Sequence, residues 1–129
     1  MHLEIRPEAV APPAANYAHA VLTTGATAWL HTSGVVPIRP DGSVPTSIDD
    51  QAEQVWLNIL AMLADAAMAV TDVVSVTTYV VWDQVPSLPR VMAARDAALG
   101  GHRAASTLVT VPALARPEWK MEIAVVAAR

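Results

Sequence analysis

The chain has 129 residues, about the length of one ordinary domain, and a formal net charge of −4 with no cysteine. Hydrophobic residues make up 53% of the chain and charged residues 16%, which excludes intrinsic disorder. Its eight basic residues are scattered, so no basic surface for nucleic acid is expected, and the lack of cysteine excludes disulfides, thiolate catalysis and cysteine-ligated metal sites.

Residues 1–16 predict an extended lead-in, because they contain three prolines and little hydrophobic periodicity. Glu4 and Glu8 interrupt this segment, so it lacks the apolar region of a secretory signal. No apolar run elsewhere reaches the roughly 18 residues that span a membrane. We therefore expect a cytoplasmic protein without a membrane partner.

Two short strands are predicted next, over 18–24 and 27–33. Gly25 and Ala26 separate them by the two residues of a tight turn, and Gly25 can adopt a positive φ. This spacing predicts a β-hairpin at the start of the domain. A loop around Asp41-Gly42 follows it.

The first helix is the most strongly indicated element. Ser47 has the position of an N-cap, and Asp49 and Asp50 lie in the first turn, where the helix dipole favours negative charge. The apolar residues that follow keep the spacing of one helical face: Ala52, Val55, Trp56, Ile59, Leu60, Leu63 and Ala67.

Residues 73–82 predict a central strand, since β-branched residues alternate there. A second helix is predicted over 87–99, with Gly100-Gly101 as its C-terminal stop. Two strands, over 105–111 and 120–127, complete the chain.

The predicted order is β-β-α-β-α-β-β, an α+β fold of one domain, 1–129, with both helices on one face of a single sheet. The other face of the sheet also presents apolar side chains, and no third helix is available to cover it. Because the core consists of small residues without phenylalanine, it is modest for a lone domain. A second copy of the subunit is the simplest cover, so self-association is predicted.

Short matches in chain order indicate a family: Tyr17 with Ala20-Val21, Thr32-Ser33-Gly34 with Pro37, Gln51-Ala52 with Asn58, Thr71–Val74 with Thr77–Val80, Ser106-Thr107, and Met121–Ile123. Over nearly its whole length the chain resembles the RidA family, also called the YjgF family. The resemblance implies a chorismate-mutase-like homotrimer with small-molecule clefts at the subunit interfaces. It also implies a hydrolase that acts as an enamine/imine deaminase and releases ammonia without a metal or an organic cofactor.

The resemblance also implies the site residues. Glu122 would position or deprotonate the attacking water, and Tyr17 would orient the substrate beside it. Among the predicted substrate-binding residues, three match family positions: Ser33, Ser106 and Thr107. Ala105 does not, because it stands where the active deaminases have an arginine that holds the substrate carboxylate. A divergent substrate is therefore expected.

Arg103 is a candidate replacement for that arginine. It stands two residues before Ala105, and such positions face the same side of an extended strand. The alternative is a solvent-facing charge in the loop after Gly101. His19 and His31 on the hairpin could pair around a metal, but lone histidines are more often hydrogen-bonded surface residues, so no metal site is predicted.

The residues of the chain leave the function open between three hypotheses. The first is hydrolysis of a divergent enamine or imine. The second is a non-catalytic trimeric protein that binds a small molecule or has a regulatory role. The third is a specialised enzyme of a biosynthetic pathway that uses the same cleft for another substrate.

Overall fold

The helices and strands of the computed structural model, which covers residues 1–129, follow the predicted order with one strand added at the N-terminus. The strands are β1 (His2–Ile5), β2 (Ala20–Thr23), β3 (Trp29–His31), β4 (Val73–Val81), β5 (Ala105–Val111) and β6 (Met121–Ala128). The helices are α1 (Ile48–Asp65) and α2 (Leu88–Leu99), with short 3-10 turns η1 (Val70–Asp72) and η2 (Trp82–Ser87) on either side of β4.

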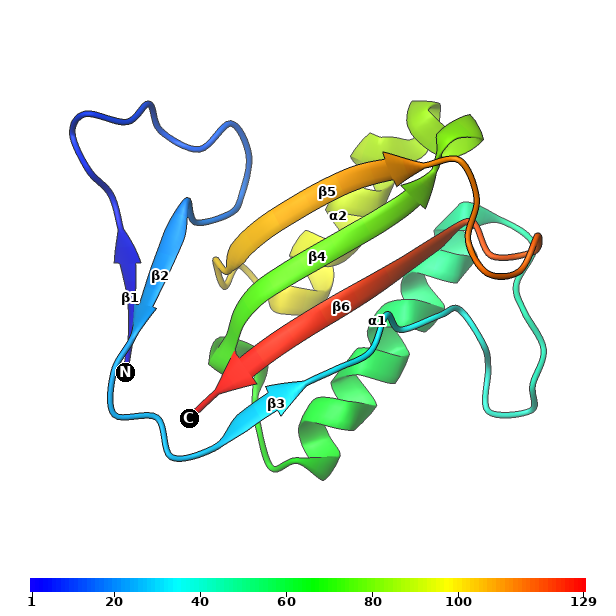
Figure 1. Cartoon of the computed structure of the whole chain (residues 1–129). Coiled ribbons are helices and arrows are strands. Elements are labelled where there is room, and N and C mark those ends of the chain that lie inside the picture. Colours follow the sequence, from blue (N-terminus) through cyan, green and yellow to red (C-terminus); the bar gives the residue numbers. More distant parts are fainter.

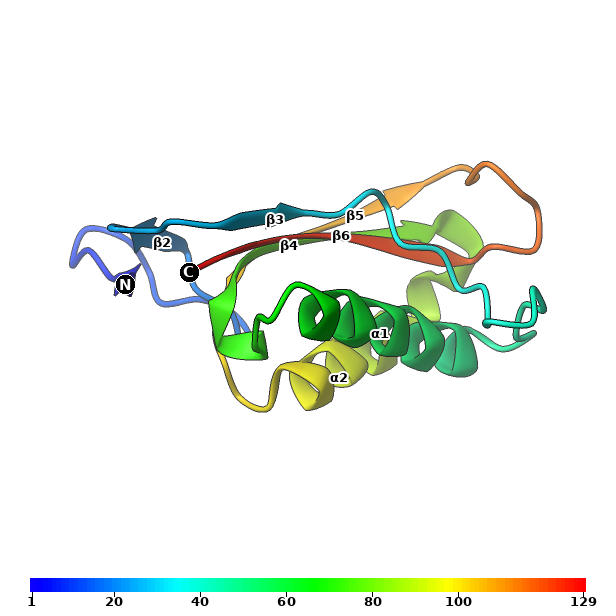
Figure 2. The same ribbon diagram turned by 90° about the horizontal axis from the view of Figure 1, so that it is seen from below.

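Four strands form a mixed sheet in the order β3-β6-β4-β5. The pair β4–β5 is parallel, whereas β6 is antiparallel to both β3 and β4. Helices α1 and α2 lie side by side on one face of this sheet, and no element covers the opposite face (Figures 1 and 2). The predicted α+β fold with both helices on one face is confirmed.

Local sequence signals account for the ends of both helices. The Ser47 hydroxyl accepts a hydrogen bond from the Asp50 backbone N–H at 3.1 Å, as expected for an N-cap. Gly100 ends α2 in the left-handed conformation at φ 58°. Trp82 departs from the prediction, because the strand stops at Val81 and the indole is 67% exposed.

The core fills the space between the sheet and the two helices. Its buried side chains come from the inner face of α1 and from alternate residues of β4 and β6: Ile48, Ala52, Val55, Trp56, Ile59, Leu63, Val73, Val76, Val80, Met121, Ile123, Val125 and Ala127. The intervening strand residues, such as Thr77 and Glu122, are only half-buried and face the uncovered side.

The predicted hairpin between 18–24 and 27–33 is wrong. β2 pairs with β1, with Glu4 opposite Val21, whereas β3 pairs with β6. The first residues of the chain, predicted to be only a lead-in, thus form a strand that pairs with one edge of β2. The two-stranded sheet β1–β2 is separate from the four-stranded sheet and lies beyond its end (Figure 1). We call residues 1–23 the N-terminal arm.

Candidate functional site

Glu122 projects from β6 onto the uncovered face of the sheet. Its neighbours Met121 and Ile123 are fully buried beneath the helices, so the alternation of the strand turns Glu122 the other way. In the register of the sheet Glu122 lies opposite Tyr79 of β4. The carboxylate therefore stands among strand side chains on a face that no helix covers.

Gly34 lies directly against this carboxylate. Val35 and Ile123 exchange two backbone hydrogen bonds, of 2.7 and 3.1 Å, which fixes the segment after β3 beside β6. A Cβ added to Gly34 would overlap the Glu122 carboxylate and lie 2.8 Å from its Cδ. A residue without a side chain is therefore required here for the observed position of Glu122. The preceding residue, Ser33, is exposed.

Two amide side chains of α1, one half-buried and one fully buried, hold the segments on either side of this contact. Asn58 of α1 donates to the carbonyls of Val36 and Ile38, at 3.2 and 3.0 Å. The fully buried Gln51 donates to the carbonyls of Pro45 and Glu118 and accepts from the Lys120 N–H, at 2.8, 2.8 and 2.9 Å. Both residues belong to the family resemblance, but only the fold reveals that they position the segments beside Gly34 and Glu122.

A second group of predicted residues gathers where β5 begins. The Ala18 N–H donates to the Ala104 carbonyl at 2.9 Å, which places Ala18 of the N-terminal arm beside Ala105. The adjacent Tyr17 is half-buried, and its ring packs edge-on against His19 with centroids 5.8 Å apart.

Arg103 fastens the N-terminal arm to this end of the sheet. Its guanidinium donates to Glu4 Oε1 at 3.0 Å and also to the Tyr17 carbonyl. Hydrogen bonds from Arg6 and then from Arg103 lower the pKa of Glu4 from 4.5 to about 2. A substrate carboxylate at Arg103 would therefore have to compete with Glu4.

Arg95 is a buried cation whose environment the sequence did not reveal. It lies on α2, is 6% exposed, and donates to the Ser106 hydroxyl at 3.2 Å. It also pairs with Asp96 at 2.9 Å. Arg95 lies at helical spacing between Val91 and Leu99, which are both buried. Since a buried arginine requires partners, this spacing could have indicated a hydrogen-bonded cation.

The side chains of β5 divide between the two faces of the sheet. Ser106 faces α2, where Arg95 occupies its hydroxyl, so only its backbone is available for the predicted role in substrate binding. Ala105 and Thr107 alternate with it and face the uncovered side, where Thr107 is exposed. No arginine side chain thus lies free beside Ala105.

The two groups of predicted residues do not meet within one chain. Along β4, Tyr79 lies opposite Glu122, whereas Ser75 lies opposite Ala105. Four residues of strand separate these positions, which is about 13 Å along the sheet. Glu122 and the Tyr17 group therefore lie toward opposite ends of the uncovered face.

The alternative of a His19–His31 metal pair fails together with the hairpin. His19 bonds through Nε2 to the Ala11 carbonyl at 2.7 Å, and His31 stacks on Trp29. No group of three histidine, aspartate or glutamate side chains is placed to hold a metal ion. Neither helix is both long and apolar enough to cross a bilayer.

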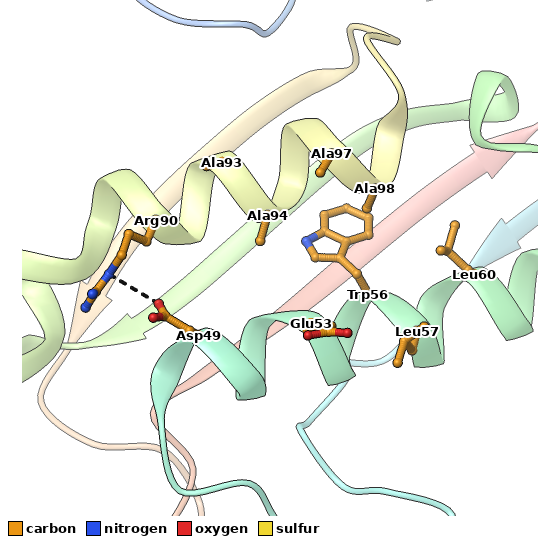
Figure 3. Close-up of a pocket in the computed structure, with 10 residues that line it drawn as sticks. All are labelled: Asp49, Glu53, Trp56, Leu57, Leu60, Arg90, Ala93, Ala94, Ala97 and Ala98. Atoms are coloured by element: carbon orange, nitrogen blue, oxygen red, sulfur yellow. Dashed lines mark ion pairs between the residues drawn. The ribbon is translucent and has the colours of Figure 1, made fainter.

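The largest cavity, of about 520 Å³, lies on the far side of the molecule from Glu122. Figure 3 shows it between α1 and α2, with Trp56 and alanines such as Ala94 along it and the Asp49–Arg90 ion pair, 3.2 Å, at one end. A smaller cavity of about 420 Å³ contains Ser33, Gly34 and Asn58. Of the predicted site residues, only Ser33 lines either cavity.

Comparisons with known proteins match nearly the whole chain. The sequence model of the family described as Endoribonuclease L-PSP matches residues 8–129. A search of curated proteins gave no match. The crystal structure of YyfB from Yersinia pestis, a Rid-family protein of unknown function, is 30% identical and has a TM-score of 0.90 over 99% of this chain and 98% of that one.

Two further structures are similar at lower TM-scores. The YjgF gene product of E. coli is 29% identical, with a TM-score of 0.71 over 98% of this chain and 95% of its own. Yeast YEO7 is 26% identical, with a TM-score of 0.71 over 99% and 98% of the two chains. YyfB and YjgF match this chain with nearly equal identity and coverage, so their different TM-scores do not come from different lengths. The backbone of this chain therefore superposes better on that of YyfB than on that of YjgF.

Proposed function

Because the chain belongs to the endoribonuclease L-PSP family, which is the family of the Rid and YjgF proteins, we propose that it hydrolyses a small enamine or imine. The observation that supports this most is the Gly34–Glu122 contact. It holds a carboxylate on an uncovered sheet face, and the adjacent Ser33 and Gly34 line a cavity of about 420 Å³.

Glu122 would act as a general base and then as a general acid. It accepts a proton from water as the water oxygen bonds to the C=N carbon, and it passes this proton to the nitrogen. Glu122 then takes the hydroxyl proton of the adduct and gives it to the nitrogen as the C–N bond breaks. The tetrahedral adduct then releases ammonia and leaves a carbonyl compound. The overall balance is one imine and one water to one carbonyl and one ammonia, and an enamine first becomes the imine by taking a proton on carbon. Tyr17 would orient the substrate.

The charges around Ala105 point to a substrate without a carboxylate. Arg103 is paired with Glu4, and Arg95 lies on the helix side with Asp96 and Ser106. Neither guanidinium is free on the uncovered face to form the two-pronged contact that holds a carboxylate. We therefore propose a neutral imine, contacted by Thr107, Ser33 and the Ser106 backbone.

The uncovered face also supports the homotrimer that the resemblance implies. Two large apolar side chains on this face, Val109 of β5 and Trp29 of β3, are 40% and 54% exposed, and a neighbouring subunit would cover them. In this proposal the substrate binds between subunits of a cytoplasmic trimer, without nucleic acid or membrane as partner. The site would use no metal or organic cofactor.

The absence of a free arginine also favours a second candidate, a trimeric protein that binds a small molecule without turnover. A specialised biosynthetic enzyme would use the same cleft on another substrate. The binding protein differs from the proposed hydrolase in the role of Glu122, because binding alone does not need a base.

Ammonia release from imines generated in situ separates these candidates. An amine oxidase supplies an imine without a carboxylate, and an amino-acid oxidase supplies a carboxylated one. We expect the protein to accelerate decay of the first above the rate in buffer and the second only weakly. Glu122→Gln should abolish the acceleration, whereas Glu118→Gln, which changes an exposed glutamate, should retain it. Binding without any acceleration would favour the second candidate.

A further inference from the structure

Four strands of the structure, β1, β2, β3 and β5, each leave one edge unpaired, and of these β2 and β3 follow each other directly in the chain. β3 forms the edge of the four-stranded sheet and pairs only with β6. β2 pairs only with β1. Unpaired strand edges present rows of free backbone donors and acceptors, and these pair readily with another strand.

The alternation of hydrogen bonds shows which groups are free on β3. The N–H groups of Ala28 and Thr32 donate to Arg129 and Val125, at 2.9 and 3.0 Å, and so point toward the C-terminal strand. The backbone groups of Trp29 and His31 therefore point to the open edge.

The same reasoning applies to β2. Thr24 and Met1 exchange two hydrogen bonds, of 2.9 and 2.7 Å, so Thr24 points toward β1. Alternation then turns the backbone groups of Val21 and Thr23 outward. Each open edge thus presents two residues, two positions apart, and the edges match in spacing.

These edges do not meet within one chain, because the hairpin that would join them is open. Residues 24–28 lead away from β2 to β3 instead of turning back, and Figures 1 and 2 show β2 beyond the end of the sheet rather than alongside β3. The Ala18–Ala104 hydrogen bond and the Arg103–Glu4 ion pair hold the N-terminal arm there. An opened hairpin with both edges free is the arrangement that allows identical chains to exchange a segment.

We propose that β2 of the N-terminal arm pairs antiparallel with β3 of a second copy of this chain. In the register that matches the free groups, Val21 lies opposite the partner's His31 and Thr23 opposite the partner's Trp29. Each arm thus extends the sheet of its neighbour by two strands. Three copies that each give an arm to the next close a ring.

Arm exchange would also bring together the two groups of site residues. In an antiparallel pair, the chain that precedes β2 runs beside the chain that follows β3. Continued in the same register, Tyr17 reaches the partner's Val35, next to the partner's Gly34 and Glu122. This inference rests on the proposed function for its chemistry. It extends the proposed function by assigning Tyr17 and Glu122 of one site to different chains.

Disulfide trapping tests the exchange without any assay of activity. The chain has no cysteine, so every thiol is an introduced one. Directly opposed residues of antiparallel strands have Cα atoms about 5.5 Å apart, which a disulfide can bridge. Two chains with different tags, one Val21→Cys and the other His31→Cys, are co-expressed and oxidised. We expect a covalent dimer that contains both tags.

The control replaces His31→Cys with Glu53→Cys, on the exposed side of α1, and should give no dimer. The double variant Val21→Cys/His31→Cys should give species of two or more linked chains. A single chain with an internal disulfide would show that the hairpin closes on itself and would overturn the exchange. Failure of the co-expressed pair to cross-link would overturn it as well.

Mixed oligomers test whether the site is shared. Chains with Tyr17→Phe and chains with Glu122→Gln are co-expressed in equal amounts. If each site takes these residues from different chains, random mixing leaves about one site in four intact. If each site lies within one chain, mixing recovers nothing. Cross-linking without turnover in the unmodified protein would retain the exchange and reject the proposed hydrolase, whereas turnover without cross-linking would do the reverse.

Discussion

Gly34 and Glu122 adjoin so closely that a methyl group on Gly34 would lie 2.8 Å from the Glu122 Cδ and overlap its carboxylate. The contact joins the end of β3 to β6, two segments nearly 90 residues apart in the sequence. Gly34 is one of the residues that carry the family resemblance, and the contact explains why: the proposed base, Glu122, can occupy its observed position only if residue 34 has no side chain.

Gly34→Ala should therefore impair turnover far more than folding. The clashing atoms belong to the far end of a flexible side chain, which can turn away at little cost in stability. A displacement of about 1 Å at a catalytic group can lower the rate about 100-fold. We expect kcat/KM to fall by at least tenfold while the Tm stays close to that of the wild type. In the Glu122→Gln background, Gly34→Ala should cause no further loss, and full activity of the single variant would contradict the proposed role.

Glu4→Gln should weaken the attachment of the N-terminal arm in a pH-dependent way. Because the folded-state pKa of Glu4 is about 2 instead of 4.5, its ionised form stabilises the folded protein above pH 4.5. This contribution is lost as the pH falls from 4.5 toward 2. The Tm of the wild type should therefore exceed that of Glu4→Gln at pH 7, and the gap should narrow on acidification. A gap that stays constant down to pH 3 would show that the Arg6 and Arg103 bonds do not stabilise the fold.

Arg95→Ala should destabilise the protein by about 2 to 3 kcal/mol, because it removes a buried side chain and leaves the Ser106 hydroxyl without its partner. Arg90→Ala on the same helix is the matched control. Its guanidinium is largely exposed, pairs with Asp49 and donates to the Ser87 hydroxyl, so its loss should cost about 1 kcal/mol, less than the loss of the buried Arg95. Urea unfolding of both variants gives the comparison. Equal shifts in the midpoint would mean that burial of Arg95 adds nothing.

Ala105→Arg should improve turnover of carboxylated imines. A guanidinium at this position lies on the uncovered face and can form two charge-assisted hydrogen bonds with a carboxylate. Such a contact contributes roughly 2 kcal/mol, so we expect kcat/KM to rise about 30-fold. Ala105→Gln adds similar bulk without charge and should give no rise. The gain should disappear when Glu122→Gln is added, since capture of the substrate without a base accelerates nothing.

The sequence predicted the elements whose signals are local. Ser47 and the helical spacing located α1, Gly100 located the end of α2, and the alternation of β-branched residues located β4. These features depend on hydrophobic periodicity and helix capping, which are determined by residues close together in the sequence. The role of Glu122 was predicted from the resemblance, and the structure places its side chain on the uncovered face.

The features that sequence reasoning missed depend on competition between distant segments. Gly25-Ala26 favours a hairpin locally, but β2 pairs with β1 in a separate sheet and β3 pairs with β6 in the main sheet. Arg95 and Ser106 come from different elements, so only the packed fold shows that they pair. The role of Arg103 likewise became visible only with Glu4 beside it.

Gln51 binds only main-chain atoms of the loop before α1 and the loop before β6. A carbonyl or an N–H is the same whatever side chain the residue has, so this clamp does not depend on the identity of those residues. The side chains of the loop before β6, including the stacked Arg116 and Trp119, can therefore change while Glu122 keeps its place two residues after the clamp. The fold thereby allows the side chains of the loop before β6 to vary while the position of Glu122 stays fixed.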